Sequence, residues 1–522
     1  MLDDQQDIIA FLSDPSSYGT GVNRVEIIET HASLLFLAGD RVYKLKRAVK
    51  YPYLDFSTAE RRKRACEAEL TLNRRTATAI YLEIRGIGRT PTDGIAFSSP
   101  DAAIDWVVVM RRFDQAVLFD ALARRGGLTA QLMDALADHV ASFHAKAEQY
   151  FDRGGAAEMA ELAEIQYRCL AAIQHAGFER EQVQEIRGKW RERVATVAPL
   201  LERRRAIGKI RYCHGDLHLR NICLFDSKPT LFDCLEFDES LASIDVLYDL
   251  AFLLMDLDHR GLANFANRVL NRYLDRTQED DGLAAMPFFL SLRAGIRAHV
   301  TATALERASG DLARTEMASE ARGYLGLAHR SLQTEPCRLI AIGGFSGTGK
   351  STLAAALAPE IGLRPGARVL RSDVIRKLLL GVDPETRLPG DAYTRETSRQ
   401  VYDTLRQKAA AGLTAGYSVI IDAVALMPEE RRCFAEVARS MAVPFSGFWL
   451  EGPAATLANR IRERRRDASD ATSEILAQQM RHDPGPIDWI RIDAGGGPEE
   501  CLAAARRALA AAWAAFRPNA ER

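Results

Sequence analysis

The stretch Gly344–Ser351, GFSGTGKS, constrains the fold of this chain more than any other segment. It matches the pattern GxxxxGK[ST] and stands between the apolar run LIAIGG and the helix-forming run STLAAALA. Glycines allow a tight turn of backbone N–H groups that binds anions, and a helix N-terminus adds the positive end of its dipole. Because such a loop needs a strand before it and a helix after it, the sequence predicts a phosphate-binding P-loop within an α/β domain.

The P-loop pattern gives individual residues a predicted role in binding a nucleotide and its metal ion. Lys350 is expected to reach the β and γ phosphates, and Ser351 to hold Mg²⁺. Asp422 ends the apolar strand VIID, where a second acidic residue can orient the metal or its water shell. The predicted nucleotide-binding residues are Gly344, Phe345, Ser346, Gly347, Thr348, Gly349, Lys350, Ser351 and Thr352.

Strand-like and helix-like segments alternate through the C-terminal third of the chain. After LIAIGG, one strand is predicted to end at Asp373, and two more are SVIIDA at 418–423 and FSGFWLE at 445–451. This alternation predicts a parallel sheet with crossover helices. An alanine-rich amphipathic helix is predicted at 500–517. Because 522 residues exceed one ordinary core, and composition changes at TEPC, the predicted domains are 1–334 and 335–522.

The N-terminal part has a different order of elements, with strands first and helices later. Residues 24–46 are predicted to hold two strands, VEIIE and LLFLA, followed by a Gly39-Asp40 turn and the alternating run RVYKLK. A helix capped by Ser57 is predicted over 57–75, and DWVVVMRRF predicts another strand. This order is typical of an α+β domain. Helices are predicted at 129–150, 157–206 and 243–333, and short strands around a polar loop at 210–233.

A second set of residues suited to phosphoryl transfer lies in HGDLHLRN, residues 214–221. Asp216 is placed to orient an acceptor hydroxyl. Asn221, five residues later, and Asp233, after a short hairpin, offer oxygen ligands that suit Mg²⁺. The spacing of these three residues predicts a second metal-dependent site.

HGDLHLRN and Asp233 resemble the catalytic loop and metal aspartate of protein kinases, and this resemblance implies a lysine that holds the α and β phosphates, expected on the strand RVYKLK. Lys44 and Lys46 fall on the same face of that strand, and one of them is expected to bind the phosphates. Its expected carboxylate partner is Glu69 on the following helix, with Glu67 as the rival.

HGDLHLRN together with FDCLEFDESLASIDVLYDLAFLLMDL resembles the aminoglycoside phosphotransferase and choline kinase side of the protein-kinase-like superfamily. The resemblance covers roughly residues 25–325 and is closest to phosphotransferase-like domains that are fused to a P-loop kinase. It implies a bilobal α+β protein-kinase-like fold and a structural role for Asp249. One departure is the turn Glu29–Ser33, which carries no glycine-rich cover for the phosphates.

The C-terminal domain resembles small P-loop kinases related to polynucleotide kinase, chloramphenicol phosphotransferase, gluconate kinase and zeta-type toxins, over roughly residues 337–495. Within RSDVIR, the resemblance implies that Asp373 accepts the proton of the acceptor hydroxyl and that Arg376 contacts substrate or phosphate. The stretch ANRIRERRRD resembles the lid of this family. Arg460 and Arg464 share a helix face there and are expected to close over the transferring phosphoryl group.

These features predict an ATP- and Mg²⁺-dependent phosphotransferase with two sites, each transferring the γ-phosphoryl group to a hydroxyl of a small molecule. One alternative is a P-loop kinase regulated by an N-terminal domain that binds a nucleotide or a metabolite. Another is a nucleotide-dependent stress or regulatory ATPase. A polynucleotide acceptor stays open for the C-terminal site, as do the identity of both acceptors and the oligomeric state.

Charge and composition narrow the expected surroundings of the protein. The formal net charge of -1 gives no reason to expect an anionic membrane or a nucleic acid as partner. No apolar run approaches the ~18 residues of a membrane span, and the acidic N-terminus does not have the pattern of a secretory signal. The eight cysteines include no CxxC pair, which fits a reducing compartment, so the predicted location is the cytoplasm.

Overall fold

The computed structural model describes residues 5–30, 32–51, 54–92, 94–99, 102–307, 310–463 and 468–516. By its internal contacts the chain forms two compact units, one of residues 1–158 and 202–256 and one of residues 159–201 and 257–522. Helices that follow residue 256 therefore group with the P-loop domain and not with the strands at the N-terminus. The domain boundary at 334/335 stays a prediction, because the two units are defined by their internal contacts and not by sequence domains.

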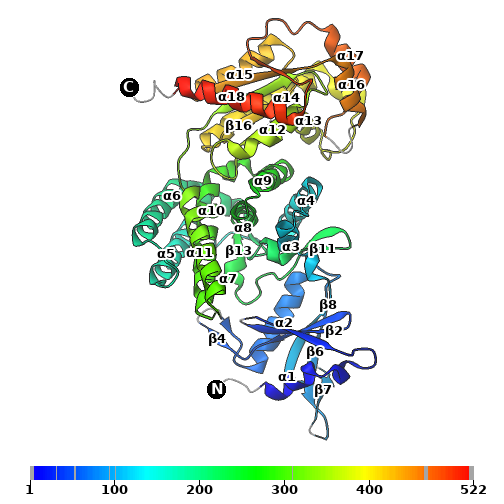
Figure 1. Ribbon diagram of the computed structural model, residues 1–522, viewed down its shortest axis with the longest axis vertical. Helices are drawn as coiled ribbons and strands as arrows, with labels where there is room; N and C mark the ends of the chain where they lie inside the picture. The colour runs from blue at the N-terminus through cyan, green and yellow to red at the C-terminus, as the bar shows by residue number, and fades with distance from the viewer. Residues whose placement is uncertain are drawn as a thin grey trace. The chain divides into compact units, whose positions relative to one another are not determined.

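The first unit contains a six-stranded antiparallel sheet in the order β1-β2-β3-β8-β6-β7. Helix α2 packs on β6 and β8 (Figure 1). It is capped by Thr58, whose Oγ1 accepts from Arg61 N, so the predicted cap Ser57 was wrong. Ser57 instead hydrogen-bonds the Asp55 carboxylate. The bounds are Val25–Glu29 for β1, Ser33–Ala38 for β2, Arg41–Lys46 for β3, Tyr81–Arg89 for β6, Ile95–Ser98 for β7, Asp105–Arg111 for β8 and Ala59–Asn73 for α2.

The rest of the first unit is mostly helical and carries a two-stranded hairpin, β11 and β12. Asp226 and Ser227 form its turn with left-handed backbone, as two-residue hairpin turns require. Its helices are α1 (Gln6–Ser13), α3 (Phe119–Arg124), α4 (Ala130–Lys146), α7 (Glu239–Ala242) and most of α8 (Val246–His259). Its short strands are β4 (Lys50–Tyr51), β5 (Leu54–Asp55), β9 (Gln149–Tyr150), β10 (Ile210–Tyr212), β11 (Ile222–Phe225), β12 (Lys228–Leu231) and β13 (Ser243–Asp245).

The second unit begins with a group of helices. The segment predicted as helical over 157–206 contains two helices, which are separated near Gly177 with its left-handed backbone. Trp190 is buried in this group, and its Nε1 donates to Ser291 Oγ at 2.8 Å. The helices are α5 (Ala156–Ala172), α6 (Arg180–Ala206), α9 (Ala263–Thr277), the 3₁₀ segment Glu279–Ala285, α10 (Met286–Ala304) and α11 (Asp311–Ser331).

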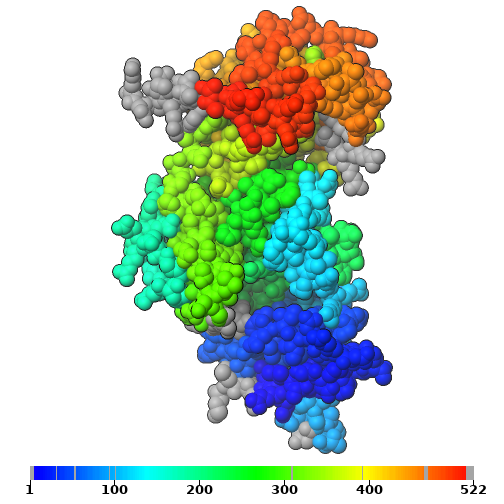
Figure 2. Space-filling view, in the orientation of Figure 1, coloured from blue at the N-terminus to red at the C-terminus, as the bar shows by residue number. Residues whose placement is uncertain are grey.

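A five-stranded parallel sheet in the order β15-β16-β14-β17-β18 forms the P-loop part of the second unit. Helices cover both faces, with α14 and α15 on one and α12 and α18 on the other (Figure 1). Figure 2 shows α18, in red, at the surface. The strands are β14 (Leu339–Gly344), β15 (Arg368–Arg371), β16 (Val419–Asp422), β17 (Phe445–Glu451) and β18 (Ile490–Asp493). The helices are α12 (Lys350–Leu357), α13 (Ser372–Leu379), α14 (Arg395–Thr414), α15 (Pro428–Ser440), α16 (Ala454–Glu463), α17 (Ser473–Arg481) and α18 (Pro498–Phe516).

Two details of this sheet differ from the prediction. Strand β15 ends at Arg371, so Asp373 lies in the first turn of α13 and not at the end of a strand. Strand β18 was not predicted, because IRID is short and largely exposed and gives only a weak alternating pattern.

Strand β15 is an edge strand of the sheet, and helix α9 covers its outer side. Asn271 Nδ2 donates to Ala367 O at 3.1 Å, and Asn271 Oδ1 accepts from Val369 N at 2.7 Å. The buried Arg368 forms ion pairs of 2.7 Å with both Asp275 and Asp280. The side chain of Asn271 thus takes the place of a neighbouring strand and satisfies backbone groups that an edge would leave open.

Within the residues that the structure describes, no helix is both long and apolar enough to span a membrane.

Candidate active sites

The P-loop has the conformation that its glycines predict. Gly344 and Gly347 have positive φ angles of 133° and 86°. A Cβ at Gly344 would lie 2.3 Å from Leu450 O, and one at Gly347 would lie 2.6 Å from Leu457 O. Larger residues at these two positions would therefore be strained and would also clash with β17 and α16.

The functional groups of the P-loop converge at the carboxyl ends of β14 and β16. Ser351 Oγ donates to Asp422 Oδ2 at 2.6 Å, and Lys350 Nζ donates to Gly344 O and Phe345 O, both at 3.0 Å. Thr352 follows in the first turn of α12 with an exposed side chain, and Thr348 Oγ1 donates to Phe345 O at 2.8 Å. A hydroxyl and a carboxylate in contact form an oxygen donor set that suits Mg²⁺.

Asp373 lies in the first turn of α13, directly after β15, at the same edge of the sheet as the P-loop. Burial raises the pKa of its carboxyl, an effect that Arg371 opposes and Asp422 reinforces. Arg371 Nε also lies 3.4 Å from Asp422 Oδ2. A carboxylate whose pKa is moved towards neutrality is better matched to accepting a proton from a hydroxyl.

The predicted arginines lie in different surroundings. Arg376 is buried, donates to Ala392 O and Ser398 Oγ, and places its guanidinium 4.7 Å from the centre of the Tyr393 ring. Arg460 donates to Ala494 O at 2.6 Å and to Gly496 O at 2.7 Å, which ties α16 to the segment after β18. These contacts are structural, and a role for either residue in phosphoryl transfer stays a prediction. Arg464 lies outside the described residues.

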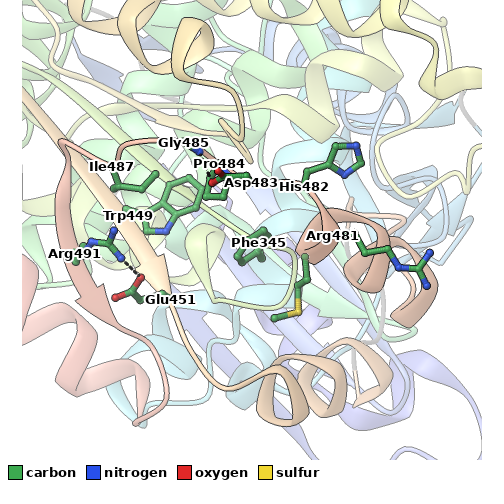
Figure 3. A pocket seen from close by; sticks show the side chains of 11 residues that line it. Phe345, Trp449, Glu451, Arg481, His482, Asp483, Pro484, Gly485, Ile487 and Arg491 are labelled. Atoms are coloured by element: carbon green, nitrogen blue, oxygen red, sulfur yellow. Dashed lines mark hydrogen bonds and ion pairs between the residues drawn. The ribbon is translucent and has the colours of Figure 1, made fainter.

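Two features of the P-loop surroundings were not predicted from the sequence. Gln479 on α17 accepts a hydrogen bond from the P-loop N–H of Ser346 at 2.9 Å. A cleft of about 510 Å³ adjoins Phe345, whose ring meets that of Trp449 edge-on with centroids 5.9 Å apart (Figure 3). Its lining includes an ion pair between Glu451 and Arg491 at 2.7 Å, so groups of both charges face this cleft.

In the first unit, both predicted lysines contact the predicted glutamate. Lys44 Nζ lies 2.7 Å from Glu69 Oε1 and 2.7 Å from Asp233 Oδ1, while Lys46 Nζ lies 2.5 Å from Glu69 Oε2. Glu67, the rival partner, is exposed on the same helix. Burial alone would raise the pKa of Glu69, but the two lysines together outweigh it and lower that pKa to about 2.

The HGD loop brings Asp216 and Asn221 into contact. Asn221 Nδ2 donates to Asp216 Oδ2 at 2.9 Å, so its amide oxygen is the atom that can serve as a metal ligand. The loop is tied to the segment of Asp233 by Phe232, whose N donates to Asn221 O at 3.0 Å and whose O contacts His214 Nε2 at 2.9 Å. Asn221 and Asp233 thus present oxygen atoms of the kind that Mg²⁺ prefers, and their role as metal ligands stays a prediction.

Asp249 on α8 holds the HGD loop in place. Its carboxylate accepts from the backbone N–H groups of His214 and Gly215 at 3.2 and 2.9 Å, and it lies 3.0 Å from His144 Nε2. Because all of these groups are buried, the pairing satisfies them together. The structural role implied for Asp249 agrees with this geometry.

One residue of the N-terminal site escaped the sequence analysis. Glu236, three residues after Asp233, forms an ion pair with Lys46. The signal available in the sequence was an additional acidic residue in DCLE, directly beside the predicted metal ligand.

Comparison with known proteins assigns both parts of the chain. Residues 61–289 match the model of the "Phosphotransferase enzyme family", and residues 339–484 match that of an "AAA domain". Together these matches support a kinase-type phosphotransfer function, with a protein-kinase-like phosphotransferase fold followed by a P-loop domain with a parallel five-stranded sheet.

Solved structures similar to parts of the chain include two kinases. A gluconokinase from Sinorhizobium meliloti 1021 is 22% identical, with a TM-score of 0.26, over 36% of this chain and 97% of its own. A choline/ethanolamine kinase family protein from Mesorhizobium loti is 13% identical, with a TM-score of 0.38, over 63% of this chain and 98% of its own.

A relative that spans both parts is the "uncharacterized protein Rv2004c" of Mycobacterium tuberculosis strain H37Rv. It is 32% identical over 488 residues, which are 92% of this chain and 94% of the relative. A protein of Mycobacterium bovis matches to the same extent. The chain therefore belongs to the same family as these mycobacterial proteins, with a phosphotransferase-enzyme-family domain followed by a P-loop domain of the AAA type.

Proposed function

We propose that this protein is an ATP- and Mg²⁺-dependent kinase with two sites, each of which transfers the γ-phosphoryl group of ATP to a hydroxyl of a small molecule. The observation that carries the proposal is that a lysine, a carboxylate suited to orienting a hydroxyl and oxygen ligands for a metal occur twice, once in each unit. A divalent metal supplies charge neutralisation to the phosphates in such sites.

At the N-terminal site, Lys44 would hold the α and β phosphates while Glu69 keeps its ammonium group in position. Asn221 and Asp233 would hold the metal. Asp216 would orient the acceptor hydroxyl and take its proton late in the transfer. Its carboxylate is partly exposed and is contacted by Asn221 and, at 3.3 Å, by His218 Nε2.

At the C-terminal site, Lys350 and the P-loop N–H groups would hold the phosphates, and Ser351 with Asp422 would hold the metal. Asp373 would accept the proton of the acceptor hydroxyl. The acceptor is proposed to be a small molecule.

A second candidate function is a P-loop kinase whose N-terminal domain binds a nucleotide or a metabolite and regulates it. The feature that favours it is the β1–β2 connection, which has no glycine between Glu29 and Ser33 to let backbone approach the phosphates. Under this function Asp216→Asn would change regulation without removing a distinct product.

The deciding experiment measures phosphate transfer from labelled ATP in a cell metabolite extract, using the wild type, Asp216→Ala and Lys350→Ala. The two-site proposal expects each variant to lose a different labelled product. Loss of products with Lys350→Ala alone would favour the regulatory function. Retention of all labelled products in the double variant would refute both.

A further inference from the structure

The N-terminal site contains a second lysine–carboxylate pair beside the pair that the proposed ATP site uses. Lys44 joins Glu69 Oε1 to Asp233, and Lys46 joins Glu69 Oε2 to Glu236. Glu69, with 0% of its side chain exposed, therefore pairs with both lysines. One lysine also pairs with the proposed metal ligand Asp233, and the other pairs with Glu236, three residues further along the same segment.

Lys46 is too enclosed to share the phosphate-binding role of Lys44. Its side chain is 1% exposed, against 12% for Lys44, and its ammonium group lies 5.3 Å from the centre of the Phe56 ring. A buried ammonium group is costly unless it is paired with carboxylates. The contacts of Lys46 with Glu69 and Glu236 satisfy that requirement. Lys46 is therefore suited to fixing the positions of these two residues.

The segment that Glu236 anchors has a conformation that needs support. Asp233 has a left-handed backbone with φ of 59°, which is unfavourable for a non-glycine residue and persists only where the surroundings enforce it. Its N–H donates to Tyr81 Oη at 3.2 Å, and Cys234 N donates to Asn73 Oδ1 at 2.9 Å. The Lys46–Glu236 pair adds an ionic attachment to the same short stretch.

The charges of this cluster indicate separate roles for the two lysines. Three carboxylates face two ammonium groups here, which leaves one excess negative charge that a cation can offset. If Lys44 bound a phosphate at the proposed site, Asp233 would lose this partner and would be available to a metal. The Lys46–Glu236 pair does not include Asp233, so it would still attach the segment to β3.

We propose that Lys46 and Glu236 are positioning residues that hold Asp233 in the place where it binds the metal of the N-terminal site. This inference rests on the function proposed for that site. It assigns a role to two residues outside the constellation of Lys44, Glu69, Asp216, Asn221 and Asp233.

The test uses the full chain with Lys350→Ala and Asp422→Asn, so that the binding of nucleotide and of Mn²⁺ at the P-loop is weakened. AMP-PNP is titrated with and without Mn²⁺, and bound Mn²⁺ is counted by electron paramagnetic resonance. Glu236→Gln and Lys46→Met are expected to weaken Mn²⁺ binding to the AMP-PNP complex by about 10- to 100-fold, as loss of a residue supporting a metal ligand does. Metal-free AMP-PNP affinity is expected to change less than about twofold, since Lys44 and Glu69 remain.

Glu67→Gln, an exposed acid on the same helix as Glu69, is the matched control and should leave Mn²⁺ binding unchanged. Hydrogen exchange of the free protein gives a second readout, in which residues 233–236 should exchange faster in Glu236→Gln than in the control. Equal Mn²⁺ affinity in Glu236→Gln and the control would overturn the inference alone. Absence of Mn²⁺–AMP-PNP binding before either substitution is made would overturn the function proposed for the site, and the inference with it.

Discussion

At the scale of the residue, the chain places buried charges where a segment of backbone has to be held. Arg368, Lys46 and Asp249 are each almost fully buried, and each is paired with groups on a different element. Removing one member of such a set leaves its partners charged and enclosed, which costs far more than loss of an exposed pair.

Arg368→Met is expected to destabilise the second unit by about 3–5 kcal/mol, because Asp275 and Asp280 would be left buried without this partner. Arg432→Met is the control. Its ion pair with Glu429 joins two side chains that are each 65% exposed, so the cost should stay below about 1 kcal/mol. Denaturant unfolding of the two variants measures the difference, and equal stability would contradict the assignment.

Asp373 gives the C-terminal site an expected pH dependence. Burial raises the pKa of this carboxyl, and only its ionised form can accept a proton. In an Asp216→Ala background, formation of the Lys350-dependent product should therefore decline on acidification. The decline should begin at a pH above the pKa of an ordinary aspartate. Asp373→Asn should lower the rate by about 10²- to 10⁴-fold and remove this limb from the pH profile of kcat/KM. A decline of kcat/KM that occurs only near the pKa of an ordinary aspartate would contradict the prediction.

At the scale of the element, short connections after parallel strands bring distant residues together. The P-loop follows β14, Asp373 follows β15 and Asp422 ends β16, and these three strands lie next to one another in the sheet. Because all of them run in the same direction, their carboxyl ends share one edge. Helix α17 adds Gln479 to this edge, through its contact with the P-loop N–H of Ser346.

Gln479→Ala is expected to strengthen AMP-PNP binding at the P-loop, since the side chain competes with phosphate for the N–H of Ser346. One hydrogen bond is worth about 1 kcal/mol net, so the gain should be about fivefold. Gln478→Ala, which alters an exposed neighbour on the same helix, is the control. Calorimetry in a Lys44→Ala background, which removes the phosphate-binding lysine proposed for the N-terminal site, measures the affinity. Weaker AMP-PNP binding in Gln479→Ala would mean that Gln479 stabilises the P-loop conformation and does not compete with phosphate for the N–H of Ser346.

At the scale of the whole molecule, the helices α9, α10 and α11, which precede residue 334, belong to the same compact unit as the P-loop sheet. Asn271 satisfies backbone groups of β15, and Lys408 on α14 lies 2.8 Å from Asp280, which also pairs with Arg368. A sheet edge that is normally covered exposes its hydrogen-bonding groups when the cover is removed. The P-loop domain therefore depends on residues that belong to the phosphotransferase part of the sequence.

A fragment of residues 335–522 is expected to be less stable than the same segment in the full chain and to self-associate. Hydrogen exchange should be faster at Val369, whose N–H loses Asn271. Asn271→Ala in the full chain should reproduce the faster exchange without the self-association, because the rest of α9 still covers the edge. A monomeric fragment with full protection at Val369 would show that β15 needs no cover.

The sequence alone determined those features that depend on local pattern and spacing. Glycines at 344, 347 and 349 between a strand and a helix predict a P-loop, since few other residues tolerate its backbone. The family resemblance called for a lysine and a glutamate, strand alternation and helix position then pointed to Lys44, Lys46 and Glu69, and the structure brings these three together. The family resemblance supplied the fold of the N-terminal part, which periodicity alone could not distinguish from other α+β arrangements.

Tertiary structure decided what depends on distant residues meeting in space. The partners of Arg368 lie more than 80 positions away, and nothing in the local pattern near Asn271 indicates that its side chain replaces a strand. The sequence also did not indicate that the guanidinium groups of Arg376 and Arg460 contact the carbonyl oxygens of Ala392 and Ala494, because these contacts depend on which acceptors the fold brings near. The grouping of α9 with the P-loop sheet has the same cause: burial is a property of the assembled chain, and the sequence of one segment does not contain it.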